Sequence, residues 1–221
     1  MKSKALEKAA ERLMELRRPT VVDVGAFTGG VAEKLIGLNP STHVYAVEAC
    51  PDNFKSLSAR AQLVENMHPV QIVISDHDGI ETFYSADIDW MDGSSQSSSL
   101  FKGQLKEKLK KHKINGYKKH KLPCMTMDTF IKSHGIIQVH LLKCNAEGVE
   151  YRMFDGECDF LNDTNMISLS IHTKGKYFSG EEFVKKRKHI YKTLADHDFE
   201  LVVGKAELQS AKHLNQLWVR A

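Results

Sequence analysis

Cysteines and long apolar runs are scarce in this sequence. The four cysteines are scattered and form no C-x-x-C pair, which argues against a disulfide framework and against a zinc site. No stretch reaches the about 18 apolar residues that a membrane span needs, and the lysine-containing N-terminus has no apolar h-region. We therefore expect a cytoplasmic protein with reduced thiols and no membrane contact.

The chain also lacks a large excess of either charge. Its 31 lysines and arginines are nearly balanced by 28 aspartates and glutamates, for a formal net charge of +3. A field this small does not by itself indicate a nucleic acid or membrane partner. At 221 residues, 42% of them hydrophobic, the chain can bury a sizeable core. We expect a single domain over residues 1–221, and the sequence does not predict the oligomeric state.

Strand-like and helix-like patterns alternate along most of the chain. Apolar residues at helical spacing over residues 3–17 predict that segment 1–18 is an amphipathic helix. Buried strands are expected at 20–26, 43–49, 69–75, 138–145, 165–172, 199–204 and 214–221, with an alternating strand at 80–86. Helices are expected at 31–38, 51–61, 127–135, 147–156 and 180–196.

This alternation predicts an α/β fold with a mostly parallel sheet and helices on both faces. Only the short segment Lys205–Lys212 separates the last two strands, which indicates a C-terminal antiparallel hairpin. A dinucleotide-binding Rossmann domain normally continues with parallel units. A Rossmann-like seven-stranded sheet with one reversed strand is instead the usual architecture of class I S-adenosylmethionine-dependent methyltransferases, and we expect that fold.

A glycine-containing turn joins the first strand to the following helix. Asp23, Gly25 and Gly29 form the pattern D-x-G-x-x-x-G, with Ala26 and Phe27 inside the turn. Glycines allow main chain to approach a ligand closely, and the helix offers unpaired N–H groups. No second glycine stands where a pyrophosphate would press on the turn. The five residues are therefore candidate contacts to a smaller ligand with a carboxylate and an amino group.

Acidic residues follow the second and third strands. Glu48, followed by Ala49, ends the second strand and could accept hydrogen bonds from both hydroxyls of a ribose. Ser75 and Asp76 follow the third strand, where Asp76 could accept a bond from an adenine amino group. Each feature alone is an ordinary turn or helix cap, and their order and spacing together predict an adenosine-containing ligand.

Six stretches occur in the order found in one enzyme family. They are "VVDVGAFTGG", "VYAVEACPDNF", "SDHDGIETFY", "SSSL", "MTMDTFI" and "LLKCNAEGVEYRMFDG". With these blocks, residues 20–172 resemble FkbM-type S-adenosylmethionine-dependent methyltransferases. The resemblance implies S-adenosylmethionine as cofactor, S-adenosylhomocysteine as product, and transfer of a methyl group to a hydroxyl oxygen of a sugar, polyketide or other small molecule.

The last block matches the family form L-K-I-D-V-E-G-A-E at four polar or glycine positions and departs from it at one. Matching residues are Lys143, Glu147, Gly148 and Glu150, whereas Asn145 replaces the usual aspartate. Ser170, two residues before His172, likewise stands where the family tends to have glutamate. These departures leave open a non-catalytic protein that binds S-adenosylmethionine or a nucleotide.

Methyl transfer to a hydroxyl needs alignment of the two reactants and removal of a proton. We expect His172 or Glu147 to be the base, with Lys143 and Glu150 in supporting contacts and Asn145 beside the cofactor. A helix cap at Glu147 and a plain strand end at His172 are the alternative. Hard cations prefer carboxylate to amide oxygen, so an asparagine at 145 and a histidine at 172 favour a metal-free site.

The helix–strand pattern is lost over residues 85–121, a Ser/Lys-rich insertion. Its part 102–121 holds nine lysines and two histidines against one glutamate. Such a run is usually a solvated segment, but before the next strand it could also form a lid over a phosphorylated or acidic acceptor. RNA is a less favoured partner, since few aromatic residues are near for base stacking. Motifs of the N-P-P-Y type for base methylation are absent, and ribose methylation of RNA stays an alternative.

Overall fold

The computed structural model describes residues 3–87, 116–146, 148–172, 180–204 and 213–221. The helices are α1 (Lys4–Met14), α2 (Gly30–Leu38), α3 (Pro51–Ala61), α5 (Met127–Ser133), α6 (Val149–Met153) and α7 (Gly180–Asp196), with a 3₁₀ turn at Asp159–Asp163. The strands are β1 (Thr20–Val24), β2 (His43–Val47), β3 (Met67–Val70), β4 (Val73–Ile74), β5 (Gly79–Asp87), β6 (Gly116–Met125), β7 (Leu141–Cys144), β8 (Met166–His172), β9 (Phe199–Val203) and β10 (His213–Arg220).

Seven strands form the main sheet in the order β3-β2-β1-β7-β8-β10-β9. Neighbours from β3 to β8 pair in parallel, whereas β10 is antiparallel to both β8 and β9. The order reverses between β1 and β7, so the carboxyl ends of these two strands flank the crevice where open α/β sheets bind ligands. The predicted mostly parallel sheet with a C-terminal antiparallel hairpin is confirmed.

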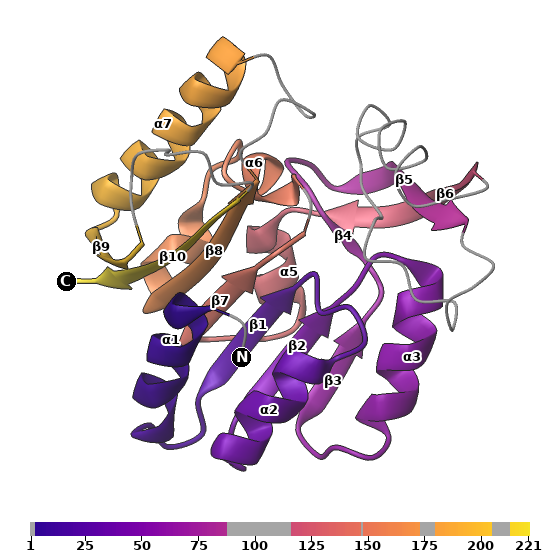
Figure 1. Ribbon diagram of the computed structural model, residues 1–221, viewed down its shortest axis with the longest axis horizontal. Coiled ribbons are helices and arrows are strands. Elements are labelled where there is room, and N and C mark those ends of the chain that lie inside the picture. Colours follow the sequence, from indigo (N-terminus) through magenta and orange to yellow (C-terminus); the bar gives the residue numbers. More distant parts are fainter. Residues whose placement is uncertain (1–2, 88–115, 147, 173–179, 205–212) are drawn as a thin grey trace.

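Helices cover both faces of this sheet, as the sequence predicted (Figure 1). Alternation along each strand separates two apolar cores. On β1, Val21 belongs to the core under α1, α2 and α3, whereas Val22 and Val24 belong to the core under α5, α6 and α7. The N-terminal helix α1 packs on its own sheet, against β8 and β10. In the part of the chain that the structure describes, no helix is long and apolar enough to cross a membrane.

The prediction of one strand over residues 69–75 was wrong. Met67–Val70 forms β3 in the main sheet, and the chain then crosses to a second sheet, of order β4-β6-β5, where Val73 and Ile74 pair with Cys124 and Met125. Strand β4 is buried, whereas in β3 only Met67 is. The linking residues Gln71 and Ile72 are neither glycine, proline nor charged, so the sequence pattern does not reveal the break.

The segment predicted to lack regular structure is shorter than 85–121. Strand β5 extends to Asp87, and β6 begins at Gly116 and pairs antiparallel with it over its whole length. Residues 88–115, which include most of the predicted lid, lie outside the described residues. The lid and the single domain over residues 1–221 stay predictions.

Candidate functional site

The turn after β1 has an unusual backbone held by β2. Gly25, Phe27 and Gly29 all have positive φ, at 75°, 55° and 82°. The amides of Gly25 and Ala26 both donate to the carbonyl of Val47 at the end of β2, at 2.9 and 3.0 Å. A non-glycine residue such as Phe27 adopts this conformation only where its surroundings enforce it. Contacts with β2 therefore hold the turn in this conformation.

Glycine at position 25 is required by the neighbouring strand. A Cβ there would lie 2.4 Å from the carbonyl oxygen of Asn145, whose own amide donates to Val24 at 3.0 Å. At Gly29 a Cβ would lie 2.8 Å from the end of the Leu57 side chain. Positive φ and protein packing account for both glycines, which the sequence argument had assigned to close approach of a ligand.

Glu48 ties the turn to the tip of β2. Its Oε2 accepts from the amide of Phe27 at 2.8 Å, and its Oε1 accepts from the amide of Cys50 at 2.9 Å and from Asn53 Nδ2 at 3.3 Å. Burial raises the pKa of the Glu48 carboxyl, although these bonds oppose the shift. The Glu48 side chain lies at the end of β2, as the sequence predicted. It accepts from the amide of Phe27, which is the non-glycine residue of the turn with positive φ.

Asp23 and Lys143 form a buried ion pair across β1 and β7. They are register partners, and Lys143 Nζ lies 2.6 Å from Asp23 Oδ1 and donates to the carbonyl of Gly25 at 2.9 Å. Asp23 is fully buried, and its Oδ2 has no hydrogen-bond partner. Such an orphaned oxygen requires an explanation, for which a buried water or a ligand cation is the usual one. The Lys143 side chain thus contacts the main chain of the turn.

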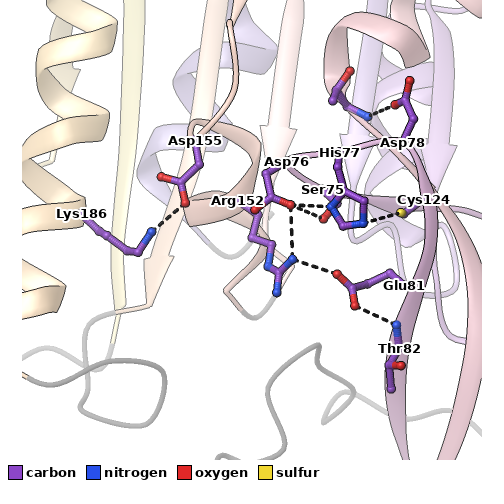
Figure 2. Close-up of polar contacts among 11 residues, drawn as sticks. Ser75, Asp76, His77, Asp78, Glu81, Thr82, Cys124, Arg152, Asp155 and Lys186 are labelled. Atoms are coloured by element: carbon purple, nitrogen blue, oxygen red, sulfur yellow. Dashed lines mark hydrogen bonds and ion pairs between the residues drawn. The ribbon is translucent and has the colours of Figure 1, made fainter.

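A second polar network surrounds the chain leaving β4 (Figure 2). Asp76 Oδ1 accepts from Ser75 Oγ at 3.1 Å, lies 2.8 Å from His77 Nδ1 and accepts from Arg152 Nη1 at 3.3 Å. Arg152 also donates to Glu81 Oε2 at 2.8 Å. Partial burial alone would raise the pKa of Asp76, but the bonds from His77 and Ser75 and the charge of Arg152 lower it. Asp76 is therefore ionised and joined to α6.

This network ends on a thiol that is not a nucleophile. His77 Nε2 lies 3.6 Å from Cys124 Sγ, so Cys124, His77 and Asp76 follow one another like a nucleophile, a base and an acid. Burial and the charges of Glu81, Asp78 and Asp76 raise the pKa of the Cys124 thiol. A reactive cysteine needs the opposite shift, so this setting does not favour a Cys124 thiolate.

An acid of α6 lies beside the histidine that ends β8. Glu150 Oε1 accepts from the amide of His172 at 2.9 Å and lies 2.8 Å from its Nδ1, and Glu150 Oε2 accepts from the amide of Gly148 at 2.8 Å. Burial of Glu150 acts to raise the pKa of its carboxyl, but the contacts with His172 outweigh burial and lower it. Since an ionised carboxylate only accepts hydrogen bonds, His172 Nδ1 carries a proton.

The chain was then compared with known proteins. The family model of the methyltransferase FkbM domain matches residues 23–201. The chain belongs to this family. Precorrin-6y C5,15-methyltransferase from Geobacter metallireducens GS-15 has a similar structure, with a TM-score of 0.50, 10% identity, and coverage of 100% of this chain and 90% of that one.

A second solved structure similar to this FkbM-domain protein is an rRNA methylase from Streptococcus thermophilus. Its TM-score is 0.50 at 12% identity, with coverage of 100% of this chain and 98% of that chain. Identities this low show the fold alone, which is that of class I S-adenosylmethionine-dependent methyltransferases. No curated protein sequence matches the chain.

Most of the predicted site residues lie on described elements of this FkbM domain, in three groups. The first group holds the turn, Glu48 and the buried ion pair, the second holds Ser75 and Asp76, and the third holds His172. Arg152 was missed by the sequence argument, although its place inside the last family block, on the helix that follows β7, was the available signal. Ala26 is buried, Ala49 is half-buried and Asn145 is exposed.

Two predictions about catalysis stay open at this site. Glu147 lies outside the described residues, so its predicted role as a base stays a prediction. Among the residues that the structure does describe, no three His, Cys, Asp or Glu side chains are grouped to hold a metal ion. Because Glu147, a possible metal ligand, is not among the described residues, the expectation of a metal-free site also stays a prediction.

Proposed function

We propose that this FkbM-domain protein transfers a methyl group from S-adenosylmethionine to a hydroxyl oxygen of a small molecule. The Glu150–His172 pair carries the proposal. In it a carboxylate orients an imidazole, and the pair lies at the same edge of the sheet as the glycine turn and Glu48. A general base in reach of the acceptor is what O-methylation requires in addition to alignment.

The residues present fit the cofactor. Glu48 Oε2 accepts one bond, from Phe27, and retains a lone pair for a ribose hydroxyl. The unpartnered Oδ2 of Asp23 suits the cofactor's amino group, directly or through a buried water. Asp76 Oδ2 takes no part in the three bonds described above and suits the adenine amino group. The proposed set also includes Gly25, Ala26, Phe27, Gly29, Ala49, Ser75 and Asn145.

His172 is the proposed base. Because Glu150 fixes the proton on Nδ1, the neutral imidazole has its basic lone pair on Nε2. When bound, the cofactor supplies an electrophilic methyl carbon on a sulfonium. As the acceptor oxygen takes up the methyl group, His172 Nε2 would accept the hydroxyl proton. Glu150 stabilises the resulting imidazolium, in the manner of the acid in a hydrolase triad.

Isotope transfer with matched variants tests the proposal. Purified protein and methyl-labelled S-adenosylmethionine are incubated with a metabolite extract and, separately, with total RNA. We expect label in small molecules, with a loss of about 10²-fold or more in His172→Phe and unchanged binding of S-adenosylhomocysteine. Transfer at the wild-type rate by His172→Phe would contradict the assignment of the base, and label in RNA alone would contradict the acceptor class.

One observation favours ribose methylation of RNA as a second candidate. Lys119 and Lys121 of β6 are exposed, and alternation places them on one face with Tyr117. The register of the two strands sets Tyr84 of β5 opposite Lys119 on that same face. Lysines interleaved with tyrosines suit single-stranded RNA. In the same assay this candidate predicts label in RNA, and its loss in the double variant Lys119→Glu/Lys121→Glu.

A further inference from the structure

Arg187, in the middle of α7, has buried donors without acceptors. Its Nε and Nη1 are buried and have no hydrogen-bond partner, and no described acidic side chain forms an ion pair with it. Its Cζ lies 5.5 Å from the ring centre of Phe183 and 5.9 Å from that of Tyr191. Ring contacts attract the cation but leave its N–H groups unsatisfied. The Arg187 residue as a whole is only partly buried, but covered N–H donors without an acceptor are costly, and native proteins seldom contain them.

The Tyr191 side chain, whose ring Arg187 contacts, belongs to a chain of hydrogen bonds. The Tyr191 hydroxyl accepts from Gln216 Nε2 at 2.6 Å, and Gln216 Oε1 accepts from the indole of Trp218 at 3.1 Å. None of the described carboxylates takes part in these contacts, so among these side chains the guanidinium has the only formal charge. The cluster that they form therefore has a positive charge and two buried N–H donors without an acceptor.

This cluster adjoins the proposed catalytic pair. The ring of Phe183 lies 6.1 Å from that of Tyr151, and the Tyr151 hydroxyl donates to the carbonyl of His172 at 2.9 Å. Arg187 is also one of the charges that act on the Tyr151 hydroxyl, together with Glu150. Two rings, those of Phe183 and Tyr151, thus link Arg187 to the strand end where the proposed base lies.

We propose that Arg187 binds a carboxylate or phosphate group of the methyl acceptor. This inference rests on the proposed function and narrows its substrate to an acidic small molecule. An anion would accept from the unsatisfied N–H groups and neutralise the guanidinium, and such charge-assisted bonds are about twice as strong as neutral ones. A role in packing alone would need the stem and the ring contacts, but no anion.

Thermal unfolding in phosphate tests for the anion site. The midpoint of the wild type is compared in inorganic phosphate and in sodium chloride of equal ionic strength. We expect phosphate to raise the midpoint above the chloride value in a saturable way, through binding to the folded state. The rise should vanish in Arg187→Met, which keeps an unbranched apolar stem against the rings, and persist in Lys188→Met, which removes an exposed charge one residue away. No saturable rise, or an equal rise in Arg187→Met, would overturn the proposal.

Kinetics then separate this inference from the proposed function. Removing the unpaired charge should not unfold the protein, since replacing buried ions by apolar side chains is often neutral or stabilising. Arg187→Met should keep the stabilisation by S-adenosylhomocysteine and raise KM for an acidic acceptor about tenfold, the loss expected for a charged hydrogen bond, with kcat little changed. If phosphate binds at Arg187 but no methyl transfer is detected, the proposed methyltransferase function is contradicted and the anion site is not. Transfer to acceptors whose KM is unchanged in Arg187→Met would count against the inference alone.

Discussion

Replacing Gly25 by alanine should destabilise the fold even without a ligand. Left-handed backbone costs alanine roughly 1–2 kcal/mol, and overpacking against main chain adds roughly 1–3 kcal/mol. The new Cβ would start 2.4 Å from the carbonyl oxygen of Asn145, which is main chain bonded to β1 and cannot rotate away. The expected total is therefore about 2–5 kcal/mol, which for a chain of this length lowers the melting temperature by roughly 4–20 °C.

Two neighbouring glycines provide matched controls. At Gly29 the obstacle is the flexible end of Leu57, so Gly29→Ala should cost less, although its φ of +82° still carries a penalty. Gly30 lies in α2 with nothing within 4 Å of the added Cβ, so Gly30→Ala should be neutral or stabilising by up to about 1 kcal/mol. Urea denaturation of the three variants gives the order. A Gly25→Ala protein within about 1 kcal/mol of the wild type would refute the packing argument.

Three other substitutions test separate contacts. Lys143→Met should cost roughly 3–5 kcal/mol in urea denaturation by leaving Asp23 buried without its partner, and a cost below about 1 kcal/mol would speak against the ion pair. The lowered pKa of Glu150 means that its stabilising effect exists above its ordinary value of 4.5 and is lost as pH falls through the lower folded value. The difference in unfolding free energy between wild type and Glu150→Gln should therefore shrink as pH falls below 4.5 and through the folded pKa of Glu150. A difference that stays constant with pH would contradict a lowered folded pKa. Glu48→Gln should lower the unfolding free energy in urea by about 1–3 kcal/mol, because the glutamine side chain has one acceptor oxygen for the two backbone amides of Phe27 and Cys50. Equal stability would mean that one of the two bonds is dispensable.

The main sheet could be predicted because its signals are local. Buried apolar strands alternate with amphipathic helices, and the short last connection reveals the reversed strand. The crossing between Val70 and Val73 could not be predicted, because no glycine, proline or charged residue marks it in the sequence. Strand β6 was missed for a different reason. Its lysines at 118, 119 and 121 suggest a solvated loop, and only the pairing with β5 makes it a strand.

The candidate site was predictable in its positions and less so in its contacts. The ends of parallel strands meet at one edge, so Asp23, Glu48 and His172 could be assigned to it from strand order alone. Which acid orients His172 depends on how the chain turns after β7, and the structure pairs it with Glu150. Pairings such as Arg152 with Asp76 join residues far apart in the sequence and follow only from the packed helices.

Binding of S-adenosylhomocysteine, measured by isothermal titration calorimetry, tests the central claim most directly. The account predicts that one equivalent binds the wild-type protein, and that Glu48→Ala weakens binding at least tenfold while His172→Phe leaves it unchanged. Absence of binding to the folded wild-type protein, or equal affinity in Glu48→Ala, would contradict the claim that an adenosine-bearing cofactor occupies the tips of β1 and β2.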